Sequence, residues 1–529
     1  LAGMARGGRP LGALGGLLFQ RTARLAAERG GTLASAYAVE SAGGMAGALL
    51  ATALVAAGGS NFAGGLLCAA ATALASPFPL RHERPRWLWP AALPLLAALA
   101  ACLGAAARLD RALTALTHPN LVAVADTPYA RVAVTLNDGQ VAVFENNALA
   151  YESQGTSAEE FVHVAALQVE RPDSALLLGG AVEGLAEEVL KHGARRVTDL
   201  ELDRRLVGLV LPVLRGGRPG IGEAREESGV RVLYGDPRQG MAAAGPCDLI
   251  LSAMPEPESG QANRYYTREF FEACRGALRP GGVLAFRLRS VENYWTPALA
   301  RRNASIRASL AAVFRDVLIL PGTTNVVLAS DSALVRDPEV LVERLRARGI
   351  QARLVSPPYL RYLVTNDRVE EILRTLAATA APENTAARPV CYAFTLQGGL
   401  TRVFPRVGYA APPSAGFVAA AAAVCSAVAL LVLLAARRTP RLRRSLLVLS
   451  AGFSGMVLEG TLLLAYQTRR GALYQDLGLL IMLFMAGLAA GSQAVGAASR
   501  RSLPGPPRKL GVLLALGPSA VAALSAWAF

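Results

Sequence analysis

The chain has 529 residues, of which 53% are hydrophobic, with a mean hydropathy of +0.34 and a formal net charge of +15. This length exceeds one ordinary domain and this hydropathy excludes an ordinary soluble protein, so we expect a membrane part joined to a globular part. The charge does not indicate nucleic acid, because the arginines crowd beside apolar runs, as at 437–444, where they anchor helices at a membrane face.

Seven apolar stretches each approach the ~20 residues that cross the hydrocarbon of a bilayer. They lie at about residues 41–58, 61–78, 88–107, 415–436, 445–466, 474–497 and 510–529. The sequence therefore predicts a multi-pass α-helical membrane protein with spans in 1–110 and 414–529. Because the chain opens at Leu1 with a short apolar run and ends at Phe529 inside another, we expect a fragment that lacks helices at its start, and the same question arises at its end.

The basic loops predict an orientation in the membrane. Arg81 to Arg86 and Arg437 to Arg444 should both be cytoplasmic, and one span separates each from the central region. The central region should then lie outside the cytoplasm, although Arg469 and Arg470 do not fit this count.

Glu459 stands inside an apolar stretch, where a carboxylate is costly and usually faces a partner or a cavity. Two interpretations stay open: a functional role for Glu459, and an interhelical hydrogen bond from a neutral acid. Small residues should let the helices approach closely. These are Gly43, Gly44, Gly47, Ala51, Gly487, Ala490 and Gly491.

Residues 117–413 have the texture of an α/β domain, because evenly spread charges accompany strand-like runs such as Arg131 to Leu136 and helix-like runs such as Asp337 to Arg348. We divide this region into three parts. They are a small β-hairpin region at 117–150, a Rossmann-like nucleoside-binding domain at 151–335 and a C-terminal α/β extension at 336–413.

Polar residues follow successive predicted strands of the Rossmann-like domain. A buried strand, Leu176 to Leu178, runs into a glycine turn, and about 20 residues later a second strand ends at an acid that can accept both ribose hydroxyls. An acid after the third strand can meet an adenine amino group, and a fourth strand runs into Ser252 to Pro257. The candidate nucleoside-binding residues are Gly179, Gly180, Gly184, Glu201, Asp203 and Asp236.

Several motifs along the region resemble those of spermidine synthases, a resemblance that covers nearly the whole central domain. The motifs include Thr127 to Arg131, Phe144 to Asn147, the glycine turn with Lys191-His192, Glu201 to Asp203, Gly235-Asp236 and Tyr266 to Phe271, followed by Leu278 to Gly282. Tyr37 to Ser41, Gly452 to Glu459 and Phe484 to Leu488 resemble the bacterial membrane-fused branch of that family.

The resemblance implies aminopropyl transfer from decarboxylated S-adenosylmethionine to putrescine, with methylthioadenosine as the other nucleoside ligand. It also implies a multi-pass protein of the bacterial inner membrane, with the lipid bilayer, a polyamine and a homodimer or larger membrane complex as partners. The candidate residues on the substrate side are Glu159, Glu160, His163 and Tyr266. A structural role for His163 and aromatic packing for Tyr266 stay open as alternatives.

The catalytic base is the weak point of the resemblance. The family's loop carries two aspartates, of which the first takes the proton of the attacking amine. Here the two positions read Ala253 and Glu256, so Glu256 becomes the candidate base. We therefore expect a degenerate site that binds a nucleoside or polyamine, or serves a membrane assembly.

Two alternatives remain open. One is an active aminopropyltransferase that makes spermidine, and the other is a transporter of polyamines or another cation that uses Glu459. We expect no metal site, because His82, His118, His163 and His192 lack ligand spacing and the six cysteines form no CxxC pair.

Overall fold

The computed structural model describes residues 2–28, 30–75, 88–216, 229–289, 295–322, 324–401, 415–435, 439–470 and 474–500. The described residues fall into two compact units. One draws on 1–113, 420–463 and 472–529, and the other on 114–419 and 464–471. Each unit is described by itself.

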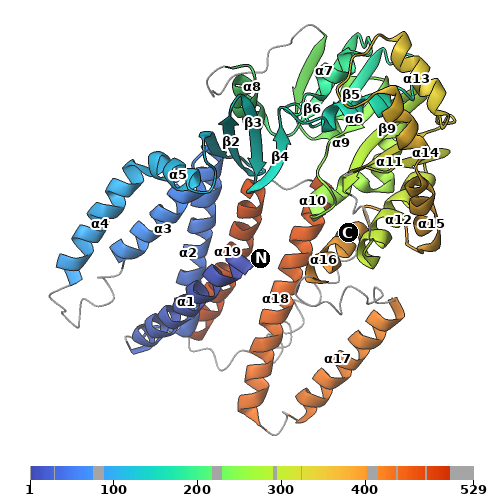
Figure 1. The fold of residues 1–529 in the computed structure, drawn as a ribbon. Coiled ribbons are helices and arrows are strands. Elements are labelled where there is room, and N and C mark those ends of the chain that lie inside the picture. The colour runs from blue at the N-terminus through green and yellow to red at the C-terminus, as the bar shows by residue number, and fades with distance from the viewer. Residues whose placement is uncertain are drawn as a thin grey trace. The chain divides into compact units, whose positions relative to one another are not determined.

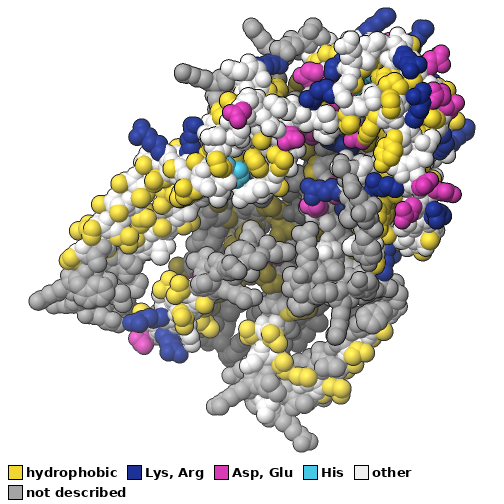
Figure 2. Space-filling model, in the orientation of Figure 1, with side chains coloured by type: hydrophobic (Ala, Val, Ile, Leu, Met, Phe, Trp, Pro, Cys, Tyr) yellow, Lys and Arg dark blue, Asp and Glu magenta, His cyan; other side chains and the backbone are white. Residues whose placement is uncertain are grey.

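The first unit is helical throughout its described part (Figure 1). Its amino-terminal helices are α1 (Ala2–Glu28), α2 (Leu33–Ala56), α3 (Asn61–Ala75), α4 (Leu88–Gly104) and α5 (Ala106–Ala115), and the later helices are α17 (Ala415–Ala435), α18 (Pro440–Arg470) and α19 (Tyr474–Arg500). The side chains of α4 in Figure 2 are mostly hydrophobic, in keeping with a sequence that has no charged residue between Leu88 and Gly104. The predicted stretch at 510–529 lies outside the described residues.

Among the described residues, two helices are long and apolar enough to cross a membrane, Leu33–Ala56 and Asp476–Ala494. A third candidate exists if α4 and α5 form one broken span, since Ala92–Gly104 and Ala106–Ala115 meet at 74°. Shorter apolar segments among the described residues are Asn61–Ala75 and Gly452–Leu464, of which the second lies within the longer helix α18.

Helices α2 and α19 pack closely through small residues. A Cβ added to Gly478 would lie 2.2 Å from Oγ1 of Thr52, and one added to Gly44 would lie 3.4 Å from Sδ of Met485. Gly44 thus has the packing role that we predicted. At Gly43, Gly47, Gly487 and Gly491 an added Cβ meets no atom within 4 Å, so the described structure gives them no such role.

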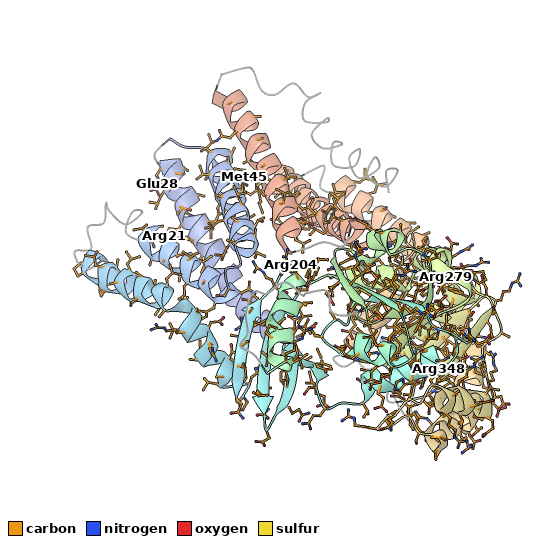
Figure 3. The ribbon with its side chains drawn as sticks, turned by 90° about the horizontal axis from the view of Figure 1, so that it is seen from above. Arg21, Glu28, Met45, Arg204, Arg279 and Arg348 are labelled. Atoms are coloured by element: carbon orange, nitrogen blue, oxygen red, sulfur yellow. The ribbon has the colours of Figure 1, made fainter. Side chains whose placement is uncertain are left out.

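The second unit begins with a four-stranded antiparallel sheet, β1 (Leu121–Asp126), β2 (Arg131–Asn137), β3 (Gln140–Glu145) and β4 (Ala148–Glu152). Its two tight turns have positive φ at both central residues, Asp138-Gly139 and Asn146-Asn147, which suits the right-handed twist of hairpin strands. This sheet packs on α8 (Arg204–Leu214), and Figure 3 shows Arg204 at the start of that helix beside the strands.

A seven-stranded sheet forms the centre of the unit, in the order β10-β11-β9-β8-β5-β6-β7. Strands β5 to β9 are parallel, and β11 lies antiparallel between β9 and β10. This is the predicted Rossmann-like arrangement, and its strand order reverses at β5. The bounds are β5 (Ser174–Leu178), β6 (Arg196–Glu201), β7 (Val230–Tyr234), β8 (Cys247–Ser252), β9 (Leu278–Arg289), β10 (Asp316–Leu320) and β11 (Thr324–Ser330).

Helices cover both faces of this sheet. Helices α6 (Ser157–Ala166) and α7 (Leu185–Leu190) pack on one face through Phe161 and Val189. The other face contacts α9 (Pro237–Ala244), α11 (Arg268–Ala277) and α12 (Pro297–Ala311), with Phe271 and Ile306 fully buried. The two short elements α10 (Gly260–Asn263) and η1 (Arg264–Tyr266) precede α11.

The extension that we predicted as α/β at 336–413 is helical in its described part, 336–401. It consists of α13 (Pro338–Ala347), α14 (Pro357–Thr365), α15 (Asp367–Ala378) and α16 (Val390–Thr401). The sequence explains the starts of the helices, since Asp337 caps α13 and Asn366 caps α15 by accepting backbone N–H bonds. Cys391 and Phe394 bury the first turns of α16.

Candidate active site

The glycine turn follows β5 at the point where the strand order reverses, which is where ligands bind in open α/β sheets. Gly179, Gly180 and Gly184 have φ of +73°, +86° and +79°. A Cβ added to Gly180 would lie 2.6 Å from Cδ1 of Leu185 and 2.9 Å from Cβ of Ala253, and one added to Gly179 would lie 2.4 Å from Cε of Met254. Packing against Ala253 therefore requires glycine at 180, a role beyond the ligand approach that the motif suggested, whereas at 179 the positive φ is the stronger reason.

Glu201 ends β6 with its carboxylate buried behind the glycine turn. It accepts hydrogen bonds from the N–H groups of Ala181 (3.3 Å), Leu202 (2.8 Å) and Asp203 (3.3 Å). Burial raises the pKa of Glu201 to about 7, and the nearby Asp203 adds to the effect although the N–H groups oppose it. Asp203 caps α8 through the N–H groups of Arg205 and Leu206.

Asp236 follows β7 and forms an ion pair with Arg264 at 2.5 Å, where the arginine is 2% exposed. Tyr265 stacks under the same guanidinium at 4.6 Å. Tyr129 follows β1 and lies near Asp203 and Asp236. Burial, followed by these two acids, raises the pKa of Tyr129 to about 12. Tyr129 was not predicted as a site residue, and its place in the Thr127 to Arg131 motif was the available signal.

Carboxyl groups without a basic partner gather on the nucleoside side of the site. Burial, Asp203 and Glu183 raise the pKa of Glu145, and burial with Glu201, Glu183 and Glu187 raises that of Asp199 well above its usual value. Among the described residues no lysine or arginine pairs with Glu145, Asp199, Glu201 or Asp203. Asp199 is therefore neutral, whereas a cationic ligand would favour the ionised forms of Glu145 and Glu201.

In the loop after β8, the predicted base Glu256 is held by hydrogen bonds within the protein. Ala253 offers no proton acceptor, and both oxygens of Glu256 have partners: Arg302 Nη1 at 2.9 Å and the backbone N–H of Arg289. The side chains of Glu256 and Arg302 are 13% and 7% exposed. Tyr266 is fully buried nearby and its hydroxyl donates to the carbonyl of Met254 at 3.0 Å, so it supports the loop.

A second arginine lies over the same loop. Nη2 of Arg287, near the carboxyl end of β9, stands 2.5 Å from Oε2 of Glu183 in the glycine turn. Because β8 lies between β9 and β5, this ion pair crosses the end of β8, next to Ala253. The guanidinium also covers the ring of Phe161 at 4.8 Å.

Glu159 and Glu160, predicted on the substrate side, make contacts within the protein. Glu159 accepts the N–H groups of Arg353 (3.0 Å), Leu354 (2.6 Å) and Val355 (2.8 Å). Burial opposes ionisation, but these N–H groups hold the pKa of Glu159 below its usual value. Glu160 accepts the hydroxyl of Tyr359, and burial raises its pKa. Both acids thus join α6 to the carboxyl-terminal extension.

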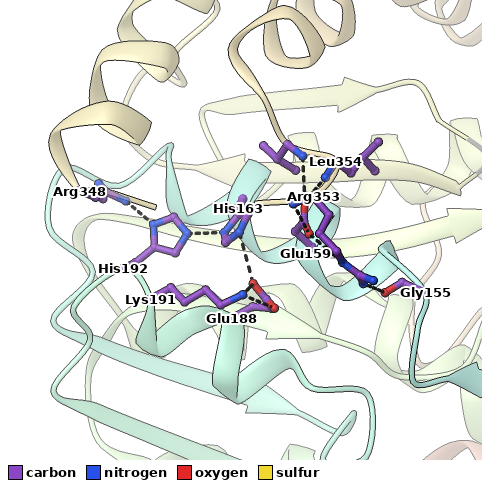
Figure 4. Close-up of polar contacts among 10 residues, drawn as sticks. Gly155, Glu159, His163, Glu188, Lys191, His192, Arg348, Arg353 and Leu354 are labelled. Atoms are coloured by element: carbon purple, nitrogen blue, oxygen red, sulfur yellow. Dashed lines mark hydrogen bonds and ion pairs between the residues drawn. The ribbon is translucent and has the colours of Figure 1, made fainter. Parts of the chain in front are cut away.

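His163 is fully buried and contacts His192 rather than an open site. Its Nδ1 lies 2.7 Å from Nε2 of His192, and its Nε2 lies 3.3 Å from Glu188. Arg348 donates to Nδ1 of His192 at 2.7 Å, and Lys191 pairs with Glu188 at 2.7 Å. Figure 4 shows Arg348, His192 and His163 in a row, with Glu188 and Lys191 below His163.

Glu459 lies half-buried in α18, in the other unit. No set of three His, Cys, Asp or Glu side chains in the described ranges is placed to hold a metal ion.

Comparison with known proteins identifies the domain type. Residues 156–299 match the spermine/spermidine synthase domain. The chain, whose matched part is called the synthase-like domain below, is 35% identical over 209 residues to a polyamine aminopropyltransferase of Nitrosomonas europaea, covering 37% of this chain and 59% of that protein. It is 26% identical over 177 residues to spermidine synthase 2 of Arabidopsis thaliana, covering 33% of this chain and 48% of that protein. The matched part thus spans less than two thirds of either relative.

Among solved structures, the chain resembles the spermidine synthase of Thermotoga maritima, with 18% identity and a TM-score of 0.38 over 48% of this chain and 88% of that one. It also resembles a spermidine synthase in complex with the transition-state analogue AdoDATO, with 19% identity and a TM-score of 0.39 over the same shares.

Proposed function

We propose that the unit at 114–419 is an aminopropyltransferase domain that binds a cationic adenosyl nucleoside, such as decarboxylated S-adenosylmethionine, and transfers its aminopropyl group to an amine. The observation that carries the proposal is a group of carboxyls at the ends of β3 and β6, Glu145, Glu201 and Asp203, that have no lysine or arginine partner among the described residues. A sulfonium and an ammonium group on the nucleoside complement Glu145, Glu201 and Asp203. The names of the matched relatives support the same chemistry.

Two acids of the site would bind the nucleoside. Glu201, when ionised, accepts the two ribose hydroxyls, and Asp236, held by Arg264, accepts the adenine amino group. The transfer forms a C–N bond at the propyl carbon and breaks its C–S bond, and the electron pair stays on sulfur as methylthioadenosine leaves.

A second candidate is a nucleoside-binding protein without turnover. It is favoured by Ala253 at the base position and by the engagement of both Glu256 oxygens. A calorimetric titration of the full chain in detergent with methylthioadenosine and decarboxylated S-adenosylmethionine, followed by a product assay with an amine, separates the two. Binding with methylthioadenosine release supports the transferase, binding alone supports the second candidate, and no binding overturns both.

We also propose that helices α2 and α19 anchor the chain in a bacterial inner membrane, with the synthase-like domain on the outer side. The apolar lengths of Leu33–Ala56 and Asp476–Ala494 support insertion, and the basic loops support the orientation. Extraction of membranes with carbonate tests insertion, and protease added to spheroplasts tests the side. Digestion of the domain only after lysis would place it in the cytoplasm instead.

A further inference from the structure

The acceptor side of the site differs in charge from the nucleoside side. Its two carboxylates each have an arginine: Glu183 pairs with Arg287, and Glu256 with Arg302. The net charge of these four side chains is zero. A diamine with two ammonium groups gains no net attraction here, and the alanine at 253 removes the carboxylate that would hold one of them.

Arg302, which pairs with Glu256, and the residue beside it have hydrogen-bond donors without partners in the described part of the chain. Nη1 of Arg302 binds Glu256 and Nε donates to Oδ1 of Asn303, but Nη2 has no partner among the described residues. Because Oδ1 of Asn303 already accepts, its Nδ2 is the free end, and this atom is also buried without a partner in the described part. Nε and Nη2 share one edge of the guanidinium, so the two free donors are neighbours.

Asn263, three residues before Tyr266, also has an amide oxygen that accepts a hydrogen bond and an amide nitrogen without a described partner. Its Oδ1 accepts the N–H of Tyr392 and its buried Nδ2 has no described partner. The three residues are 6%, 3% and 1% exposed, in the order Arg302, Asn303 and Asn263. Each of the three free atoms is a donor. Buried donors call for an acceptor, and a planar carboxylate fits an arginine edge with an adjacent amide.

We propose that the acceptor is an amine that carries a carboxylate, an amino acid in the broad sense, and that Arg302 and Asn303 bind that carboxylate. The inference rests on the proposed transferase function and names the substrate class for the same site. In the reaction, the amine nitrogen of the acceptor forms the C–N bond, sulfur keeps the electron pair of the broken C–S bond, and the ammonium proton passes to solvent.

A matched pair of acceptors tests the proposal. Putrescine and 4-aminobutanoate share one amine and a similar chain, but the second ammonium of putrescine is replaced by a carboxylate. The full chain in detergent, with decarboxylated S-adenosylmethionine, should release methylthioadenosine with a kcat/KM at least tenfold higher for 4-aminobutanoate. Faster turnover with putrescine overturns the inference and leaves the transferase function standing.

Variants locate the carboxylate. Asn303→Asp keeps the shape of the side chain and adds a negative charge, so it should abolish the preference for 4-aminobutanoate. Arg302→Met combined with Glu256→Gln removes both charges of the buried pair and should do the same. The affinity for methylthioadenosine, unchanged within about twofold, shows that each variant is folded. Retention of the preference in both variants contradicts the proposal. Nucleoside binding without turnover of either acceptor also overturns it, whereas loss of nucleoside binding by the native chain overturns the proposed function itself.

Discussion

His192 donates its Nε2–H to Nδ1 of His163 across 2.7 Å, at the centre of the line that runs from Arg348 to Glu188. The guanidinium of Arg348 can only donate, so Nδ1 of His192 accepts and both imidazoles are neutral. Burial, followed by His163, Arg348 and Lys191, lowers the pKa of His192 to about 2, and burial lowers that of His163. A neutral pair therefore joins α6, α7 and α13.

Acid should weaken this junction. A histidine whose native pKa lies below its unfolded pKa of ~6.5 stabilises the fold fully above that pH and loses the contribution as the pH falls. We expect the free energy of unfolding of the synthase-like domain to fall below pH 6.5 by up to ~1.4 kcal/mol per pH unit for each histidine. His192→Gln should lower the stability at pH 7.5 but reduce this slope. Hydrogen exchange of α7 and α13 between pH 5 and 7.5 measures it, and an unchanged slope in the variant contradicts the assignment.

Nucleoside affinity should increase as the pH rises through 7. Only the ionised form of Glu201 can accept two ribose hydroxyls, and the pKa of this group is about 7. Methylthioadenosine should therefore bind about tenfold more tightly at pH 8 than at pH 6. Glu201→Gln should lose about 10- to 100-fold in affinity and the pH dependence with it. Calorimetry at the two pH values tests both statements, and an equally steep profile in the variant would assign it to another group.

Gly180 should tolerate no side chain. Gly180→Ala meets Leu185 and Ala253 in addition to the unfavourable φ of +86°, and we expect a loss of about 2–4 kcal/mol in stability. Gly193→Ala is the control, because Gly193 has a φ of +81° but no neighbour within 4 Å of an added Cβ. Hydrogen exchange in β5 and α7 compares the two, and equal losses would show that φ alone requires the glycine at 180.

The contact between α2 and α19 should depend on Gly478. Gly478→Leu places side-chain atoms against Thr52 and the carbonyl of Ala48, and overpacking of this kind costs about 1–3 kcal/mol. Gly487→Leu, on the same helix, meets no atom within 4 Å of its Cβ and should have a small effect. Thermal melting of the full chain in detergent distinguishes them. A lower midpoint for Gly487→Leu than for Gly478→Leu would contradict the packing described.

Local chemistry made parts of the fold predictable. The buried run Leu176 to Leu178 with glycines after it predicted β5 and its turn, because apolar strands of a parallel sheet are buried on both faces. The helix predicted at Asp337 to Arg348 is α13, with Asp337 as its cap and Arg348 directly after it. In both cases the signal lies within a dozen residues.

Relationships between distant residues escaped prediction. Glu256 was a candidate base by its position in the loop, yet its partner Arg302 is 46 residues away and no local pattern joins them. Glu159 was assigned to substrate, but its three donors lie nearly 200 residues later. His163 likewise had no visible link to His192. A carboxylate or imidazole in a motif reveals its chemistry, whereas its availability depends on which side chains tertiary packing brings to it.

Val182 of the glycine turn is buried in one apolar cluster with Val132 and Val143 of the small sheet and with Leu206 and Val210 of α8. The four-stranded sheet and the nucleoside turn thus share their interior. A recombinant protein that starts at residue 156, where the match to the synthase domain begins, would lose six of the ten buried residues of this cluster and expose the apolar side chains of the other four. A soluble, folded fragment should therefore begin before β1, near residue 114, even though the strands from β1 to β4 contribute few of the motif residues.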